Sequence, residues 1–375
     1  MSAVDAVRLA VGSVTDPELR RPLADLGMIR DVRIDGTTAH VDMVLTIVGC
    51  PAATRIEADV RAAALSVAGV AEADIHVGVM TPAERAELTE KLRAGRHARV
   101  MPFGPDSLTR VIAVTSGKGG VGKSTITANL AIALAKQGLR VGLIDADVHG
   151  FSIPALMGIP ANTTPTRLDD MILPPIAHDV RVISIGMFLQ AGNNNGAVAW
   201  RGPMLHRTVL QFLTDVYFGD LDVLLLDMPP GTGDMAISVG QILPHAEVLV
   251  VTTPQAAASD VAVRSGLVAR QTGQNIIGVV ENMAALTLPD GSVLELFGSG
   301  GGDEVARALS DDTHEVAVLT RVPLSVALRT GGDTGEAVVL AAPDDPAAVA
   351  ITNLATLVKS RGRGLEGRSL SMTVS

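Results

Sequence analysis

The sequence predicts an α/β protein in which a doubly wound parallel sheet follows a small α+β domain. The apolar residues are mostly Ala, Val, Leu and Ile, because 47% of the 375 residues are hydrophobic while only six Phe, one Tyr and one Trp are present. This composition suits helices packed on a buried parallel sheet. From residue 110 onward, short β-branched runs alternate with Ala-rich helical stretches, a spacing typical of βαβ units. The expected strands are Val111–Thr115, Val141–Ile144, Val180–Ile185, Val223–Leu226, Val248–Val251, Ile276–Val280 and Val316–Val322.

The first 80 residues form the predicted α+β domain. Its expected elements are a helix over Val4–Val14, a hairpin turning at Asp35-Gly36, a helix over Ala52–Val67 and a strand over Ile75–Val79. The charged residues 81–107 are interpreted as a solvated linker. Residues 108–359 are assigned to the second domain, and residues 360–375 to a flexible tail.

Charge and hydropathy narrow the classes of function. The chain carries 30 basic and 40 acidic residues, for a net charge of −10, which argues against non-specific binding of nucleic acid. No apolar run approaches the ~18 residues of a membrane span. A single cysteine, Cys50, excludes an internal disulfide. We therefore expect a cytoplasmic protein that engages neither nucleic acid nor membrane.

The strongest motif follows the first expected strand of the second domain and opens a helix. It has the Gly-x₄-Gly-Lys-Ser spacing of a phosphate-binding loop, in which successive backbone N–H groups and the helix dipole converge on phosphate. Lys123 is expected to bridge the β- and γ-phosphates of ATP, and the Ser124 hydroxyl to ligate Mg²⁺. The predicted ATP-binding residues are Gly117, Lys118, Gly119, Gly120, Val121, Gly122, Lys123, Ser124 and Thr125.

Carboxylates end two of the expected strands. Because the carboxyl ends of parallel strands face the ligand crevice of such sheets, these groups are candidate site residues. Asp227 follows four apolar residues, a pattern typical of a Walker B strand, and is expected to hold Mg²⁺ through water. Asp145 is either a site residue or a capping residue. Asp147 is the second carboxylate after that strand.

The loop, with Lys118 one residue after its first glycine, resembles the deviant P-loop of the ParA, MinD and nitrogenase-iron-protein superfamily. That resemblance implies a homodimer in which Lys118 reaches the phosphates of the partner's site, as an arginine finger would. It also places Asp147 as the carboxylate that orients the attacking water and contributes to the Mg²⁺ site.

Longer motifs resemble the Mrp/ApbC family of iron–sulfur cluster carrier ATPases. They are Trp200–His206, Asp227–Asp234, Val279–Met283 and Phe297–Gly302. The resemblance implies that Asn282 reads the adenine base. The segments Asp16–Glu18 and Thr46–Pro51 resemble the small iron–sulfur-assembly domain often fused ahead of these ATPases. Together the motifs span residues 5–358.

One departure from the family concerns its Cys-x-x-Cys pair, with which two subunits supply four thiolates to a bridging cluster. The two cysteine positions fall here on Leu288 and Gly291, and Asp290-Gly291 predicts a tight hairpin instead. Cys50 is the remaining candidate cluster ligand. It is alternatively a buried small apolar residue or a site of regulatory oxidation.

The resemblance implies an Mg²⁺-dependent ATPase that binds iron–sulfur clusters and delivers them to apoproteins. Two alternatives remain open. One is a MinD- or ParA-like positioning ATPase, which would use the same ATP site. The other is a nucleotide-gated scaffold that has lost cluster binding together with the cysteine pair.

Overall fold

The computed structural model describes residues 2–47, 52–93, 101–147, 150–189, 202–288 and 290–361. The chain divides into two compact units. Unit 1 comprises residues 1–100, 165–175 and 214–219, and unit 2 comprises residues 101–164, 176–213 and 220–375. Cys50 and the residues from 362 onward, which include nearly all of the predicted tail, lie outside the described residues.

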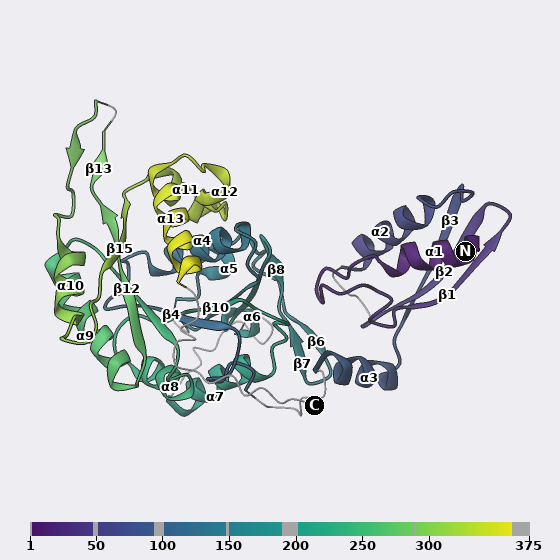
Figure 1. Cartoon of the computed structure of the whole chain (residues 1–375), viewed down its shortest axis with the longest axis horizontal. Coiled ribbons are helices and arrows are strands. Elements are labelled where there is room, and N and C mark those ends of the chain that lie inside the picture. Colours follow the sequence, from purple (N-terminus) through teal and green to yellow (C-terminus); the bar gives the residue numbers. More distant parts are fainter. Residues whose placement is uncertain are drawn as a thin grey trace, which may run out of the picture. The chain divides into compact units, whose positions relative to one another are not determined.

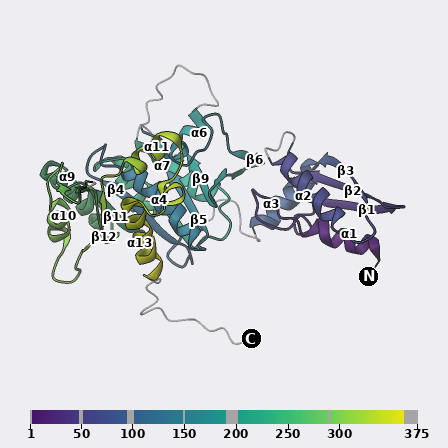
Figure 2. The ribbon, with the colours of Figure 1, turned by 90° about the horizontal axis from the view of Figure 1, so that it is seen from above.

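Unit 1 is built on a three-stranded sheet in the order β1-β2-β3, in which β1 and β2 are antiparallel and β2 and β3 parallel. Helices α1 and α2 pack against one face of it (Figure 2). The predicted hairpin turns at Asp35-Gly36, as expected, with Gly36 at φ 58°. The elements of unit 1 are α1 (Ala3–Gly12), β1 (Ile29–Asp35), β2 (Thr38–Leu45), α2 (Ala53–Leu65), β3 (Glu72–Val79), α3 (Pro82–Arg93), β6 (Thr166–Leu168) and β7 (Met171–Leu173).

Part of the predicted linker, residues 81–107, is a packed helix and not a solvated segment. Residues 82–93 form helix α3, and its Leu88 and Leu92 are buried in the apolar core of unit 1. Phe103, farther along the same segment, is also buried. The reason is packing: half of the residues of α3 are charged, but its two leucines are four residues apart and share one face of the helix.

Unit 2 contains an eight-stranded sheet in the order β15-β12-β11-β4-β10-β5-β9-β8, parallel throughout except for β8. Strand order reverses beside β4: the chain moves from β4 through α4 toward β5, and from β10 through α8 toward β11. Right-handed crossovers therefore put α4 on one face of the sheet and α8 and α9 on the other (Figure 1). The strands are β4 (Arg110–Ser116), β5 (Val141–Asp145), β8 (Ile176–Ala177), β9 (Val180–Ser184), β10 (Val223–Asp227), β11 (Glu247–Thr252), β12 (Asn275–Ala284) and β15 (Val318–Pro323).

The doubly wound parallel sheet and the small preceding domain confirm the predicted fold class. All seven expected strands are present, and the last begins at Val318 rather than Val316. The helices of unit 2 are α4 (Lys123–Lys136), α5 (Ile153–Leu156), α6 (Gly186–Leu189), α7 (Gly202–Thr214, which ends at the boundary with unit 1), α8 (Asp234–Ile242), α9 (Ala256–Gln271), α10 (Gly301–Leu309), α11 (Val326–Thr334), α12 (Val338–Ala341) and α13 (Pro346–Ser360).

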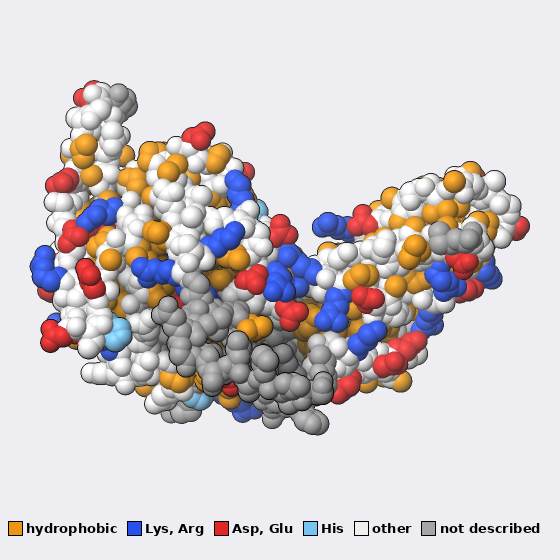
Figure 3. Space-filling view, in the orientation of Figure 1, with side chains coloured by type: hydrophobic (Ala, Val, Ile, Leu, Met, Phe, Trp, Pro, Cys, Tyr) orange, Lys and Arg blue, Asp and Glu red, His pale blue; other side chains and the backbone are white. Residues whose placement is uncertain are grey.

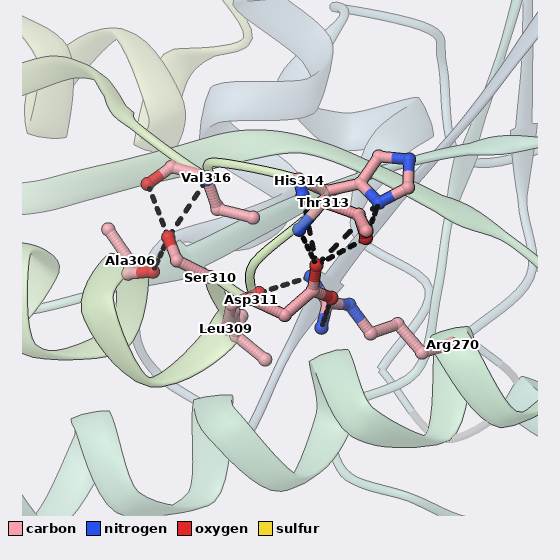
Figure 4. A network of polar contacts seen from close by, with 8 residues as sticks. All are labelled: Arg270, Ala306, Leu309, Ser310, Asp311, Thr313, His314 and Val316. Atoms are coloured by element: carbon pink, nitrogen blue, oxygen red, sulfur yellow. Dashed lines mark hydrogen bonds and ion pairs between the residues drawn. The ribbon is translucent and has the colours of Figure 1, made fainter.

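A polar network joins α9, α10 and the segment before β15 (Figure 4). Arg270, on α9, donates to Oδ2 of Asp311 at 2.7 Å. Oδ1 of Asp311 accepts from the hydroxyl of Thr313 and from the backbone N–H groups of Thr313 and His314. These hydrogen bonds, Thr313 first, lower the pKa of Asp311. The network fixes the turn through which the chain enters the edge strand of the sheet.

The surface carries charges of both signs. On the face drawn in Figure 3, basic and acidic side chains are interspersed over both units. Within the described part of the chain, no helix combines the length and the apolar character that crossing a membrane requires.

Candidate nucleotide site

The loop between β4 and α4 forms one wall of a cleft at the carboxyl edge of the sheet. An added Cβ on Gly117 would lie 2.2 Å from the backbone nitrogen of Ala262, and one on Gly122 would lie 2.2 Å from Nδ2 of Asn282. Gly122 also has φ 80°, which disfavours a side chain. Glycine is therefore required at both positions, because α9 and β12 approach the loop too closely for a side chain. The cleft has a volume of about 340 Å³. It is lined by Ser116, Lys118 through Thr125, Asp147, Gly150, Ser152 and Pro230.

Asp227, at the end of β10, is the centre of the polar contacts in this cleft. Its carboxylate is fully buried, and Oδ2 lies 2.7 Å from Nζ of Lys123. The hydroxyl of Ser124 donates to the same oxygen at 2.6 Å. A buried cation, a carboxylate and a hydroxyl thus converge at the amino end of α4. Hydroxyl and carboxylate oxygens are the ligands that Mg²⁺ prefers, directly or through water, so these residues fit such an ion.

Thr127 also belongs to this cluster, although it is not among the residues predicted for the site. Its hydroxyl donates to Oδ1 of Asp227 at 2.9 Å, while Ser124 and Lys123 hold Oδ2. The Thr127 side chain therefore fixes the rotation of the carboxylate. Its position gave a usable signal: four residues after Lys123, it lies on the same face of α4.

Asp145 and Asp147 follow β5, the strand next to β10. Asp145 pairs in register with Asp227, and it accepts hydrogen bonds from the Ser184 hydroxyl and the Asp147 N–H. Burial, with the neighbouring charge of Asp227, raises the pKa of Asp145 to about 7. Asp145 therefore braces the end of the strand. Asp147 lines the cleft, and its Oδ1 accepts from the Gly150 N–H at 3.1 Å.

Two further predicted residues contact neighbouring loops. Lys118 lines the cleft, and its Nζ lies 3.3 Å from Oε1 of Gln255, the residue that precedes α9. Asn282, near the end of β12, is buried, and its Nδ2 donates to the backbone oxygen of Val121 at 2.8 Å. The amide of Asn282 thus ties β12 to the phosphate-loop segment. Gln255 carried no signal in the sequence, because its contact depends on the fold.

The segment where the family has its cysteine pair is a hairpin. Strands β13 (Leu286–Thr287) and β14 (Val293–Leu294) pair in antiparallel register. Gly291, at φ 83°, and Asp290, which accepts from Ser292, form the turn, as expected. Neither Leu288 nor Gly291 has an atom that ligates iron. Among the described residues, no group of three or more His, Cys, Asp and Glu side chains could hold a metal ion.

Comparison with known proteins gives matches over both parts of the chain. The ParA family, described as the NUBPL iron-transfer P-loop NTPase, matches residues 107–359, and the iron–sulfur cluster assembly protein family matches residues 4–77. An iron–sulfur cluster carrier protein of Mycobacterium tuberculosis is 53% identical over 371 residues, 98% of this chain and 96% of its own length. One from Synechocystis is 36% identical over 366 residues, 96% of this chain and 98% of its own.

A solved structure is similar to the second unit. It is a nucleotide-binding protein from Archaeoglobus fulgidus in complex with ADP, with a TM-score of 0.51 and 36% identity. The match covers 61% of this chain and 87% of that chain. The relative binds its nucleotide on a fold that this chain shares.

Proposed function

Since the chain belongs to the ParA family of iron-transfer P-loop NTPases and carries an iron–sulfur cluster assembly domain ahead of it, we propose that it binds iron–sulfur clusters and transfers them to apoproteins under the control of ATP. The similarity to carrier proteins runs over nearly the whole chain, so it includes both domains. The observation that most supports the control by ATP is the convergence of Lys123, Ser124 and Asp227 in the loop-lined cleft.

The chain is an ATPase, and its own residues divide the work of hydrolysis. In the structure Lys123 is paired with Asp227. When the β- and γ-phosphates enter the loop, Lys123 exchanges this carboxylate for phosphate oxygens, and the loop N–H groups bind the phosphates beside it. Asp147, which lines the cleft, orients the attacking water. Positioning and charge neutralisation supply most of the catalysis in such reactions.

Mg²⁺ supplies charge neutralisation on the β- and γ-phosphates when it is bound. Ser124 would hold it directly, and Asp227 through a water molecule. The support is the 2.6 Å hydrogen bond between the two side chains, which places two suitable oxygens together. Thr127, by fixing Asp227, prevents the carboxylate from rotating away when Lys123 leaves it.

We further propose that the protein acts as a homodimer in which Lys118 enters the partner's cleft. Among the residues that the structure describes, Nζ of Lys118 contacts Oε1 of Gln255 at 3.3 Å, and the lysine side chain is half-exposed. Such a contact is weak, so the lysine is easily redirected toward a phosphate. ATP binding would then favour the dimer, because the phosphates supply the missing anionic partner.

The cluster is the cargo, and Cys50 is its proposed thiolate ligand from this chain. The experiment is anaerobic reconstitution with iron and sulfide, followed by transfer to an apo-ferredoxin, monitored by circular dichroism of the acceptor cluster. Wild type should transfer faster with Mg·ATP than without it. Lys123→Ala should load the same amount of cluster but lose the ATP effect. Failure of wild type to load any cluster would contradict the carrier function and favour the nucleotide-gated scaffold.

A further inference from the structure

A hairpin from the middle of the chain forms part of the core of unit 1. Strands β6 and β7 pair through Thr166↔Leu173 and Leu168↔Met171. Leu168, Met171 and Leu173 are each at most 3% exposed, and they belong to the same apolar cluster as the core residues of the first 93 residues. Three buried side chains on so short a hairpin make it a structural part of unit 1, the N-terminal module of the chain. The module therefore includes chain that follows the ATP loop in sequence.

Polar contacts fasten the same hairpin on its outer side. The turn residues Asp169 and Asp170 form ion pairs with Arg85 and Arg93 of α3, at 3.7 and 2.7 Å. The hydroxyl of Thr166 donates to Glu18 at 3.2 Å. The hairpin thus contacts both α3 and the segment after α1. It is held by apolar packing and by charges, and so it moves with the module.

The segment that contains the hairpin starts at the nucleotide cleft and returns to the carboxylate of Asp145. Before the hairpin, Gly150 and Ser152 line the cleft, and the N–H of Ile153 donates to Oδ2 of Asp145 at 3.3 Å. After the hairpin, the hydroxyl of Ser184 donates to the same oxygen at 3.0 Å. The carboxylate of Asp145 therefore binds both ends of the segment 153–184, which contains the hairpin. Its other oxygen accepts from the N–H of Asp147.

From this arrangement we propose that the β6–β7 hairpin couples the ATP cleft to the N-terminal module. This inference rests on the proposed ATPase function and adds a regulatory connection to it. Asp147 and Gly150 line the cleft and are joined by the hydrogen bond from the Gly150 N–H to Oδ1 of Asp147, so a nucleotide bound in the cleft contacts the residues at the start of this segment. Residues 150–152 lead directly into the segment 153–184, which contains the hairpin. Each nucleotide state therefore favours a different position of the hairpin, and with it a different state of the module.

Hydrogen exchange of the full-length protein, followed by mass spectrometry, tests the coupling. Exchange is compared with and without Mg²⁺ and the slowly hydrolysed analogue ATPγS. We expect slower exchange in residues 117–125, where the nucleotide binds, and a nucleotide-dependent change in peptides from β6–β7, α3 and β1. No change in residues 117–125 would overturn the ATP site, and the coupling with it. Slower exchange in residues 117–125 without a change in the exchange of the module would overturn the coupling but not the ATP site.

An insertion separates coupling from simple stability. Four Gly and Ser residues are inserted between Ala161 and Asn162, two exposed residues that lie between the cleft and the hairpin. A matched control carries the same insertion between Gly291 and Ser292, in the exposed turn of β13–β14. The first variant should keep the protection of residues 117–125 and lose the response of the module, whereas the control should keep both.

An undiminished response of the module in the Ala161–Asn162 insertion variant would overturn the proposal. A shorter insertion of two residues at the same site covers the case in which the longer one fails to fold, and its far-ultraviolet circular dichroism establishes that it is folded. A module response that falls with insertion length supports coupling through this segment.

Discussion

Nζ of Lys123 lies 2.7 Å from Oδ2 of Asp227, and both side chains are buried. The pair places a cation where phosphate oxygens are expected, and the carboxylate neutralises its charge. A buried cation without any partner would be strongly disfavoured, so Asp227 stabilises Lys123 in addition to its proposed role beside Mg²⁺.

Replacing Lys123 with Ala should weaken Mg·ATP binding by a factor of about 10 to 100, since a hydrogen bond to a charged group contributes about 1.5–3 kcal/mol. Isothermal titration calorimetry measures the affinity. Lys118→Ala is the matched control, because Lys118 is proposed to act in the partner's site, and it should keep most of the affinity of one chain. Unchanged ATP affinity in Lys123→Ala would contradict the assignment of the loop. The melting temperature of each variant is measured alongside, because Lys123→Ala leaves Asp227 without its buried partner.

Thr127 offers a test that separates positioning from packing. Thr127→Val keeps the shape of the side chain but leaves Oδ1 of Asp227 without its hydroxyl donor. The concentration of Mg²⁺ needed for half-maximal nucleotide binding should rise several-fold, while Thr127→Ser, which retains the hydroxyl, should restore it. A purely structural role predicts the opposite order, because serine lacks the methyl group that fills the core.

The loop, the sheet and the placement of Asp227 could be predicted from sequence because each depends on local pattern. Glycine spacing, a β-branched strand before the loop and an Ala-rich helix after it are all contiguous in the chain. The role of α3 could not be predicted, since its leucines are buried by packing that the local charge pattern conceals. The β6–β7 hairpin is the same case at longer range: its three buried residues pack on a module whose core residues lie more than 70 positions earlier in the chain.

Thr127 and Gln255 were missed for related reasons. A threonine in a buried helix is common, so the spacing of Thr127 from Lys123 was a weak signal, and its contact with Asp227 forms only when α4 packs on β10. Gln255 reaches Lys118 from a segment 137 positions later. Asn282 was singled out for its motif, but its contact with the oxygen of Val121 is visible only after β12 and the loop are brought together.

The raised pKa of Asp145 predicts a pH dependence of stability in the absence of Mg²⁺. The carboxyl has an ordinary pKa of 3.8 and a pKa of about 7 in the fold, because of burial first and of Asp227 second. Between pH 4 and 7 the folded state thus retains a proton that the unfolded state has released. The free energy of unfolding therefore falls as the pH rises through this range, by at most about 1.4 kcal/mol per pH unit for one proton.

Urea unfolding of wild type and Asp145→Asn at several pH values measures this effect. The variant cannot ionise, so its stability should fall less between pH 4 and 7. Buried Asp16 and half-buried Glu18 also have raised pKa values, but they are present in both proteins and cancel in the difference. Identical slopes for the two proteins would show that Asp145 is ionised throughout.

The proposed role of Lys118 predicts complementation between two inactive variants. Lys118→Ala protomers keep Asp147, and Asp147→Ala protomers keep Lys118, so a mixed dimer contains one site with both groups. Random mixing in equal amounts should therefore restore about a quarter of the wild-type ATPase rate. The control is each variant alone at the same total concentration. If the mixture never exceeds the two parents, Lys118 does not act across subunits.

The stability of a bound cluster should depend on how many thiolates the chain supplies. An Fe₄S₄ cluster is usually held by four cysteines, and a homodimer of this chain supplies two, since Cys50 is the one cysteine in the sequence. A cluster bound between two copies of Cys50 must take its remaining ligands from elsewhere, such as a small thiol, and should therefore be labile. Iron and sulfide content after anaerobic reconstitution should be lost in Cys50→Ser and unchanged in Leu288→Ala, which alters a family cysteine position that carries no ligand here. Adding glutathione should raise the content of wild type but not that of Cys50→Ser. Equal content in wild type and Cys50→Ser would exclude Cys50 as the ligand.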